Sequence, residues 1–173
     1  MSQSGPIIGS WKRNVPMLLL AVAGLAGSLW AADPMIGTWK LNIAKSQLPP
    51  IQANTQENSF VVRELGDDFE LIAKGTQKGG SAISLKYTWP QQGGFRKYEY
   101  GGPGEGISIV DILVDSGDGY TKGNGYSVIL RNGRQIAVTQ WIISKDGKIW
   151  RGIGKATAPG GKSYEGLQWW EKQ

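Results

Sequence analysis

Residues 82–89 read AISLKYTW, and apolar and polar side chains take turns along this stretch. The large apolar or aromatic residues stand at every second position, namely Ile83, Leu85, Tyr87 and Trp89. Successive side chains of a β-strand point to opposite faces of the sheet, so this period marks a strand with one buried face and one face in water. The stretch therefore predicts a half-buried β-strand.

Similar runs recur along the chain, and no stretch longer than about ten residues shows the 3.6-residue apolar period of a helix. Turn residues that tolerate a positive φ separate the runs, most clearly Asn132-Gly133 and Asp146-Gly147. Short turns pair consecutive strands, and closing such a meander removes its unpaired edges. We therefore predict an all-β fold, an antiparallel up-and-down β-barrel of about 8–10 strands, with a two-sheet sandwich as the alternative. The further runs cover residues 36–43, 59–65, 69–74, 95–100, 107–114, 120–130, 135–144, 148–156 and 164–172.

The first 32 residues differ in composition from the rest of the chain. Two basic residues precede an apolar run at 15–29, and Ala31-Ala32 follow it. This order is typical of a secretory signal peptide. The apolar run is shorter than the roughly 20 residues that cross a bilayer, so we expect cleavage near Ala31-Ala32 or, as a rival site, at 26–28. An uncleaved signal anchor is the alternative. The chain thus divides into a signal segment, 1–32, and one domain, 33–173.

The composition excludes several kinds of chemistry. The chain has no cysteine and no histidine, which excludes disulfides, thiolate nucleophiles, serine–histidine triads and histidine-bearing zinc sites. We expect no metal and no cofactor. Secreted animal domains of this size usually carry disulfides, so an exported chain without them indicates a bacterial periplasmic or secreted protein.

The net charge gives little indication of a partner. The signal segment holds two of the nineteen basic residues and none of the fourteen acidic ones, so +5 for the whole chain becomes +3 for 33–173. Both signs are interspersed along the chain, whereas a nucleic-acid binder gathers its positive charge in a stripe. We therefore expect no nucleic-acid partner. We also expect a monomer, whose only contact with a membrane would be through an uncleaved signal segment.

The stretch GTWKLNIAKS at 37–46 resembles the opening strand of the calycins, the lipocalins and fatty-acid-binding proteins, which starts Gly-x-Trp. Together with SKDGK at 144–148 and WEK at 170–172, it more specifically resembles a group of small exported bacterial proteins without a settled function. The resemblance implies a lipocalin-like barrel with a ligand inside and with Trp39 as the plug of its closed end. In lipocalins an arginine on the last strand packs across this indole, and Arg151 is the nearest counterpart.

Two features of the chain depart from the fatty-acid-binding proteins. Those proteins carry a two-helix lid after the first strand, but the matching stretch here, 44–57, contains Pro49-Pro50, which disfavours packed helices. They also hold the ligand carboxylate with an Arg-x-Tyr pair on the last strand, and 167–171 reads LQWWE. Fatty-acid binding by that mechanism is therefore not expected.

Fifteen aromatic residues remain in 33–173, and they allow two interpretations. Because each removes about 150–250 Å² from water, they can fill a small barrel completely. They can also line a cavity for an apolar or aromatic ligand. The alternation places Tyr87 with Trp89, and Tyr98 with Tyr100, on common faces, so these four are the candidate pocket residues.

Two polar residues interrupt runs that are suited to burial. Asp111 stands in the apolar run 107–114, and an unpaired buried carboxylate would have a raised pKa, as catalytic acids do. Alternatively, Asp111 meets water or a Lys or Arg of the neighbouring strand. Gln140, between Val138 and Ile142, is either a polar group inside a cavity or a satisfied core or rim residue.

Three functional hypotheses follow. The first is a non-catalytic binder or carrier of a small apolar or aromatic molecule. The second is an envelope or extracellular interaction module with a filled barrel. The third is a barrel enzyme that uses Tyr, Asp or Glu as acid or base. A cavity of a few hundred Å³ walled by aromatics favours the first, and a large exposed apolar patch favours the second.

Overall fold

The computed structural model describes residues 33–114, 124–157 and 161–173. The expected signal segment, 1–32, lies outside the described residues. The described part is all-β, and its only helical elements are two short 3-10 turns, η1 (Ile43–Lys45) and η2 (Pro50–Gln52). The strands are β1 (Gly37–Leu41), β2 (Thr55–Leu65), β3 (Asp68–Gln77), β4 (Ala82–Pro90), β5 (Gly94–Phe95), β6 (Lys97–Tyr100), β7 (Ile107–Leu113), β8 (Gly125–Arg131), β9 (Arg134–Ile143), β10 (Ile149–Thr157) and β11 (Ser163–Lys172).

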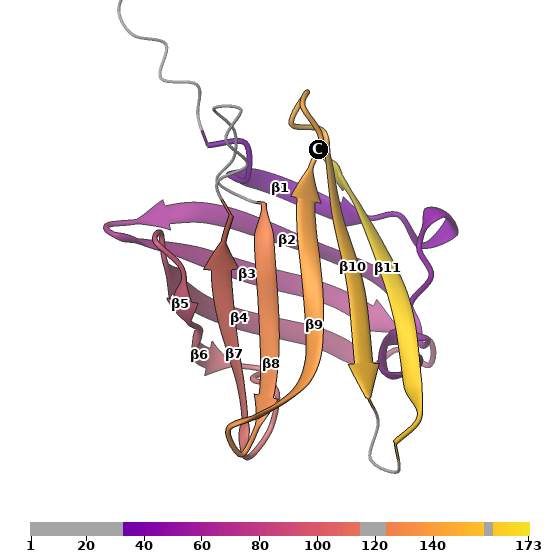
Figure 1. Ribbon diagram of the computed structural model, residues 1–173. Coiled ribbons are helices and arrows are strands. Elements are labelled where there is room, and N and C mark those ends of the chain that lie inside the picture. The colour runs from indigo at the N-terminus through magenta and orange to yellow at the C-terminus, as the bar shows by residue number, and fades with distance from the viewer. Residues whose placement is uncertain (1–32, 115–123, 158–160) are drawn as a thin grey trace, which may run out of the picture. The chain divides into compact units, whose positions relative to one another are not determined.

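These strands form one antiparallel sheet that curls into a nearly closed barrel. Consecutive strands pair from β1 to β4 and from β7 to β11, and β11 returns to pair with β1. In Figure 1, β1 to β4 run across the view behind the steep strands β7 to β11. The predicted all-β up-and-down barrel is confirmed. The turn at Asn132-Gly133 also has the predicted conformation, with φ of 49° and 76°, which matches the twist of the strands it joins.

A bent segment, residues 94–100, completes the ring. Its first part, β5, pairs with β7, and its second part, β6, pairs with β4. The predicted single strand at 95–100 is therefore wrong, and the sheet has eleven strands instead of 8–10. The bend begins at Gly93, which has a φ of 82°, and where a Cβ would lie 2.7 Å from the Asp111 carbonyl oxygen. The chain can approach β7 this closely only without a side chain.

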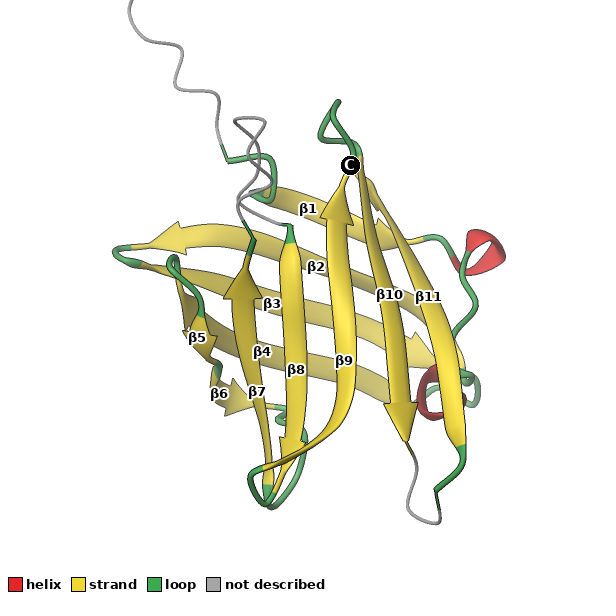
Figure 2. Ribbon diagram, in the orientation of Figure 1, coloured by secondary structure: helices red, strands yellow, loops and turns green. Residues whose placement is uncertain are grey.

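The link between β1 and β2 contains the two 3-10 turns, coloured red in Figure 2. Pro49 precedes η2 and Pro50 begins it, which agrees with the expectation that this proline pair disfavours a two-helix lid. Within the described residues, no helix is long and apolar enough to cross a membrane.

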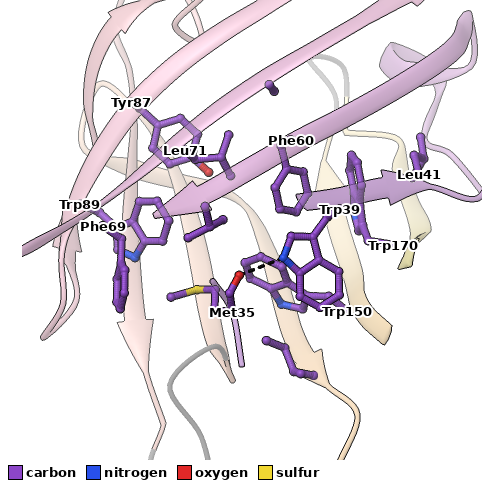
Figure 3. Packing of buried hydrophobic residues seen from close by; sticks show 13 residues of the cluster. Met35, Trp39, Leu41, Phe60, Phe69, Leu71, Tyr87, Trp89, Trp150 and Trp170 are labelled. Carbon is purple, nitrogen blue, oxygen red and sulfur yellow. Dashed lines mark hydrogen bonds between the residues drawn. The ribbon is translucent and has the colours of Figure 1, made fainter. Parts of the chain in front are cut away.

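The core lies where β1 to β4 meet the adjoining ends of β9, β10 and β11 (Figure 3). Trp39 is completely buried, and its indole N–H donates to the Met35 carbonyl oxygen at 2.9 Å. Its ring centre lies 5.4 Å from that of Trp150. The buried apolar residues are Met35, Trp39, Leu41, Phe60, Val62, Phe69, Leu71, Ala73, Tyr87, Trp89, Ile143, Trp150 and Trp170.

The cation over Trp39 comes from the last strand. The Lys172 ammonium lies 5.4 Å from the centre of the Trp39 ring, within the range of a cation–π interaction. Arg151, the counterpart expected from the lipocalin resemblance, instead lies over Trp169 at 5.8 Å. That expectation is wrong because Arg151 pairs with Trp169 across β10 and β11, on the opposite face from Trp150.

Candidate functional site

The barrel interior contains a chamber of about 260 Å³, which we call the inner chamber. Aromatic rings from both layers of the barrel form much of its wall, so it is a space suited to flat apolar groups. These rings belong to Phe60, Tyr87, Trp89, Trp141, Trp150 and Trp170.

A second space, the outer chamber, adjoins it toward the end of the barrel where β8 leads into β9. Its volume is about 400 Å³, and it shares five lining residues with the inner chamber. Glycines at inward positions of β10 and β11, Gly152, Gly154 and Gly166, keep this part of the barrel open. We call the two chambers together the lumen. The shared residues are Gln52, Ile109, Ile129, Thr139 and Gln168.

An ion pair lies in the wall of the inner chamber. Arg96, at the bend between β5 and β6, donates from Nε to Asp111 Oδ2 at 2.7 Å and from Nη2 to Asp111 Oδ1 at 2.8 Å. Only about a tenth of each side chain is exposed. Two parallel hydrogen bonds between a guanidinium and a carboxylate fix both the position and the orientation of the pair.

Ser127 on β8 extends this pair into a network. Its hydroxyl donates to Asp111 Oδ1 at 2.6 Å and accepts from Arg96 Nη2 and from Trp141 Nε1, each at 2.7 Å. A hydroxyl has one donor and two acceptor positions, so Ser127 is fully used by these three bonds. The network therefore ties the Trp141 indole to the ion pair.

Two tyrosines complete the surroundings of Arg96. The guanidinium carbon lies 4.5 Å from the centre of the Tyr87 ring, and the Tyr98 ring packs against Tyr87 at 5.2 Å. Burial raises the pKa of Tyr87 and of Tyr98 above the ordinary value, and the charge of Arg96 opposes both shifts. Both phenols are neutral at ordinary pH and serve as rings with a polar group.

Arg96 stays charged despite its burial. Burial acts to lower the pKa of the guanidinium, but the oxygens of Tyr87 and Asp111 outweigh this and raise the pKa above its ordinary value. The cation and the carboxylate therefore cancel each other's charge inside the barrel.

The structure brings together four of the six candidate pocket residues. Tyr87, Trp89 and Asp111 line the inner chamber, and Tyr98 packs against Tyr87 behind it. Asp111 takes the second of its two predicted environments, because its partner is an arginine of the neighbouring strand segment.

Tyr100 and Gln140 lie elsewhere. A register shift between β4 and β6 sets Tyr98 opposite Tyr87 but Tyr100 opposite Lys86. The two tyrosines therefore do not share a face, and Tyr100 is 38% exposed. Gln140 is exposed on the outer face of β9, where it pairs with Tyr126.

Sequence reasoning missed the roles of Arg96 and Ser127. Arg96 counted only as one of the interspersed charges, although alternation through 95–100 places it on the same face as Tyr98 and Tyr100. In the structure Arg96 lies inside the barrel, as Tyr98 does, and Phe95 is 59% exposed. The signal that could have found it is Asp111, because a carboxylate in an apolar strand needs a cation close by, and Arg96 stands on the segment beside it.

No protein-family model matches the chain, and no curated protein sequence matches it significantly. Among the described residues, no group of acidic side chains could hold a metal ion. What the site offers chemically is therefore aromatic surface, a neutralised ion pair and a few polar atoms.

Proposed function

We propose that this protein is an exported, calycin-like barrel that binds a small apolar or aromatic molecule in its lumen without transforming it. The observation that carries the proposal is the lumen itself, an inner chamber of about 260 Å³ walled by aromatic rings and adjoining an outer chamber of about 400 Å³. Ligand pockets commonly have about this size and this apolar lining with few polar groups. The opening strand GTWKLN and the buried Trp39 support the calycin resemblance.

The hydrogen bonds that Asp111 accepts favour a binding function over a catalytic one. Both carboxylate oxygens accept hydrogen bonds from Arg96, and one also accepts from Ser127. A general base needs a lone pair within reach of the proton that it removes, and here the lone pairs are directed at the protein's own donors. Asp111 therefore shapes the chamber instead of acting on a bound molecule.

The proposal is tested by native mass spectrometry of the protein purified from the periplasm or medium, combined with tryptophan fluorescence titrations of apolar and aromatic compounds. We expect a co-purifying small molecule, or quenching by members of the set. Thr139→Phe, which places a ring where the two chambers meet, should abolish binding. Gln140→Phe, on the outer face of the same strand, is the matched control and should leave it intact. Equal binding by both variants would overturn the proposal.

A second candidate function, an interaction module, has one observation in its favour. Ile112, Tyr126 and Ile153 form a row across the outer face of β7, β8 and β10, with Gln140 of β9 between them, and each is more than a third exposed. Apolar surface of this kind often marks an interface. Light scattering of the wild-type protein and of Ile112→Ser tests it, since a self-association that this substitution abolishes would support the module.

A further inference from the structure

We infer that the ligand ends in an oxygen anion, such as a carboxylate, which lies in the outer chamber beside Arg131 while its uncharged body extends into the inner chamber. This inference rests on the proposed function and specifies the class of its ligand. Two observations carry it. One arginine faces the outer chamber without a counter-ion, and a second arginine stands directly beside the first.

Arg131 is the last residue of β8, and its side chain lies on the inner face of the barrel. It pairs with Ile107 of β7, and such cross-strand partners share a face of the sheet. Ile107 and Arg131 both line the outer chamber, as do Ile109 and Ile129, the next pair on this face. The Arg131 side chain is also exposed, at the lower end of the barrel in Figure 1. A molecule that fills the outer chamber therefore meets this cation at the chamber's mouth.

Arg134 stands opposite Arg131 across the turn Asn132-Gly133. The Cβ atoms of such partners lie about 5 Å apart, and like charges in these positions destabilise a sheet. Neither arginine makes an ion pair within the described residues. The loop before β7 approaches this turn, since the Asn132 N–H donates to the Gly106 carbonyl oxygen at 2.8 Å, but Glu105 of that loop pairs with neither arginine. The two guanidinium groups therefore lack a counter-ion, and a ligand carboxylate or sulfate can supply it.

The two chambers differ in charge. Of the described residues that line the outer chamber, only Arg131 and Lys155 are charged. The Lys155 ammonium pairs with the exposed Glu165 carboxylate at 2.8 Å, so Arg131 is the charge that stays uncompensated. In the inner chamber, Arg96 and Asp111 neutralise each other. An anionic group is therefore favoured in the outer chamber, and an uncharged group in the inner one.

The barrel also sets the length of such a ligand. Ser127 lines the inner chamber and Arg131 the outer one, and they stand four positions apart on the inner face of β8. At a rise of about 3.3 Å per residue this is about 13 Å along the strand. The inner wall is largely aromatic, whereas isoleucines form much of the outer wall. A flat aromatic group joined to the anion by an alkyl chain suits both walls.

The test uses four probes with one body, titrated by calorimetry into the protein purified from the periplasm or medium. They are 6-(2-naphthyl)hexanoate, 6-(2-naphthyl)hexyl sulfate, the neutral alcohol 6-(2-naphthyl)hexanol and 6-(2-naphthyl)hexylammonium. We expect at least one anion to bind about tenfold more tightly than the alcohol at low salt, and the ammonium to bind more weakly than the alcohol. Salt should reduce this anion advantage, because both arginines are exposed. An advantage of either anion supports the inference, and the tighter of the two identifies the anionic group.

Three variants locate the effect. Arg131→Gln should remove most of the anion advantage while the affinity for the alcohol stays the same, and Arg134→Gln should act in the same direction. Lys145→Gln is the matched control, because it removes an exposed positive charge in the turn between β9 and β10, at the opposite end of the barrel. It should leave the anion advantage intact. Neither arginine substitution should lower the melting temperature, since each relieves the repulsion between two like charges.

Equal affinity of the alcohol and both anions would overturn the inference while leaving the proposed function in place, because binding of the alcohol reports that the lumen accepts the apolar body. An anion advantage that survives both arginine substitutions would also overturn it, and so would one that Lys145→Gln reduces equally. If none of the four probes binds the wild-type protein, the proposed function and the inference fail together.

Discussion

Arg96 and Asp111 are joined by two hydrogen bonds of 2.7 and 2.8 Å across the place where the barrel closes. Arg96 stands at the bend that pairs on one side with β4 and on the other with β7, and Asp111 is the β7 residue opposite Gly94. The same contact therefore closes the ring of strands and neutralises the wall of the inner chamber. Stability and ligand choice are coupled through this one pair.

The first prediction concerns stability. Asp111→Asn leaves a buried guanidinium without its counter-ion, so we expect the free energy of unfolding to fall by about 3 kcal/mol. Urea denaturation at neutral pH measures this. Glu165→Gln, which breaks the exposed pair between Lys155 and Glu165, is the control and should change stability little. Equal stability of the two variants would show that the internal pair does not hold the closure.

The second prediction concerns ligand charge. In Asp111→Asn the guanidinium keeps its charge and loses its carboxylate, so a ligand carboxylate can take the vacated position. We expect the affinity for 2-naphthoate, relative to 2-naphthamide, to rise at least tenfold over wild type. Calorimetry under conditions where the variant is folded measures the ratio. An unchanged ratio would mean that Arg96 does not reach the bound molecule.

The third prediction concerns acid stability and a buried carboxylate on the outside of the barrel. Glu70 on β3 is almost fully buried between Arg63 and Lys86. The Arg63 hydrogen bond lowers the pKa of Glu70 below its ordinary 4.5, burial opposes this, and Lys86 adds to the lowering. The folded state therefore binds a proton on the Glu70 carboxylate less tightly than the unfolded state does. The stability that ionised Glu70 contributes is present above its ordinary pKa and is lost as the pH falls through its folded pKa.

Glu70→Gln should therefore flatten the fall in the free energy of unfolding between about pH 6 and about pH 3, with the difference from wild type shrinking as the pH falls. Denaturation curves over this range measure it. Glu64→Gln, an exposed carboxylate on the adjacent strand, serves as the control. A wild-type pH profile retained in Glu70→Gln would assign the acid sensitivity to other carboxylates.

Those parts of the fold that depend on local rules could be predicted. The alternation at 82–89 orients Tyr87 and Trp89 inward, where both are buried, and Asn132-Gly133 forms the tight turn that its residues favour. Such features depend on neighbours in sequence, and the period of two is maintained while a strand stays regular.

The positions that sequence could not orient are those where the period breaks. The bend at Arg96 and the register shift opposite Lys86 arise because this segment pairs with β7 at one end and with β4 at the other. A shift of one residue sends every following side chain to the other face. Tyr100 thereby leaves the face that it would share with Tyr98. Arg96 meets Asp111 because β5 pairs with β7, and no local pattern contains that pairing.

The last prediction concerns the contact between Gly152 and Trp141, which determines how the indole lies in the lumen. A Cβ at position 152 would lie 2.6 Å from the Trp141 ring, so the indole in its present position requires a glycine there. Gly152→Ala should push the indole away from Ser127 and break its 2.7 Å hydrogen bond. We expect a loss of about 1–3 kcal/mol in the free energy of unfolding, as in other overpacked interiors. A double-mutant cycle separates this effect from strand propensity: with Trp141→Ala already present, Gly152→Ala should cost little, because the ring that it meets is gone. The same cost in both backgrounds would show that Gly152 is needed for the β10 backbone and not for the placement of Trp141.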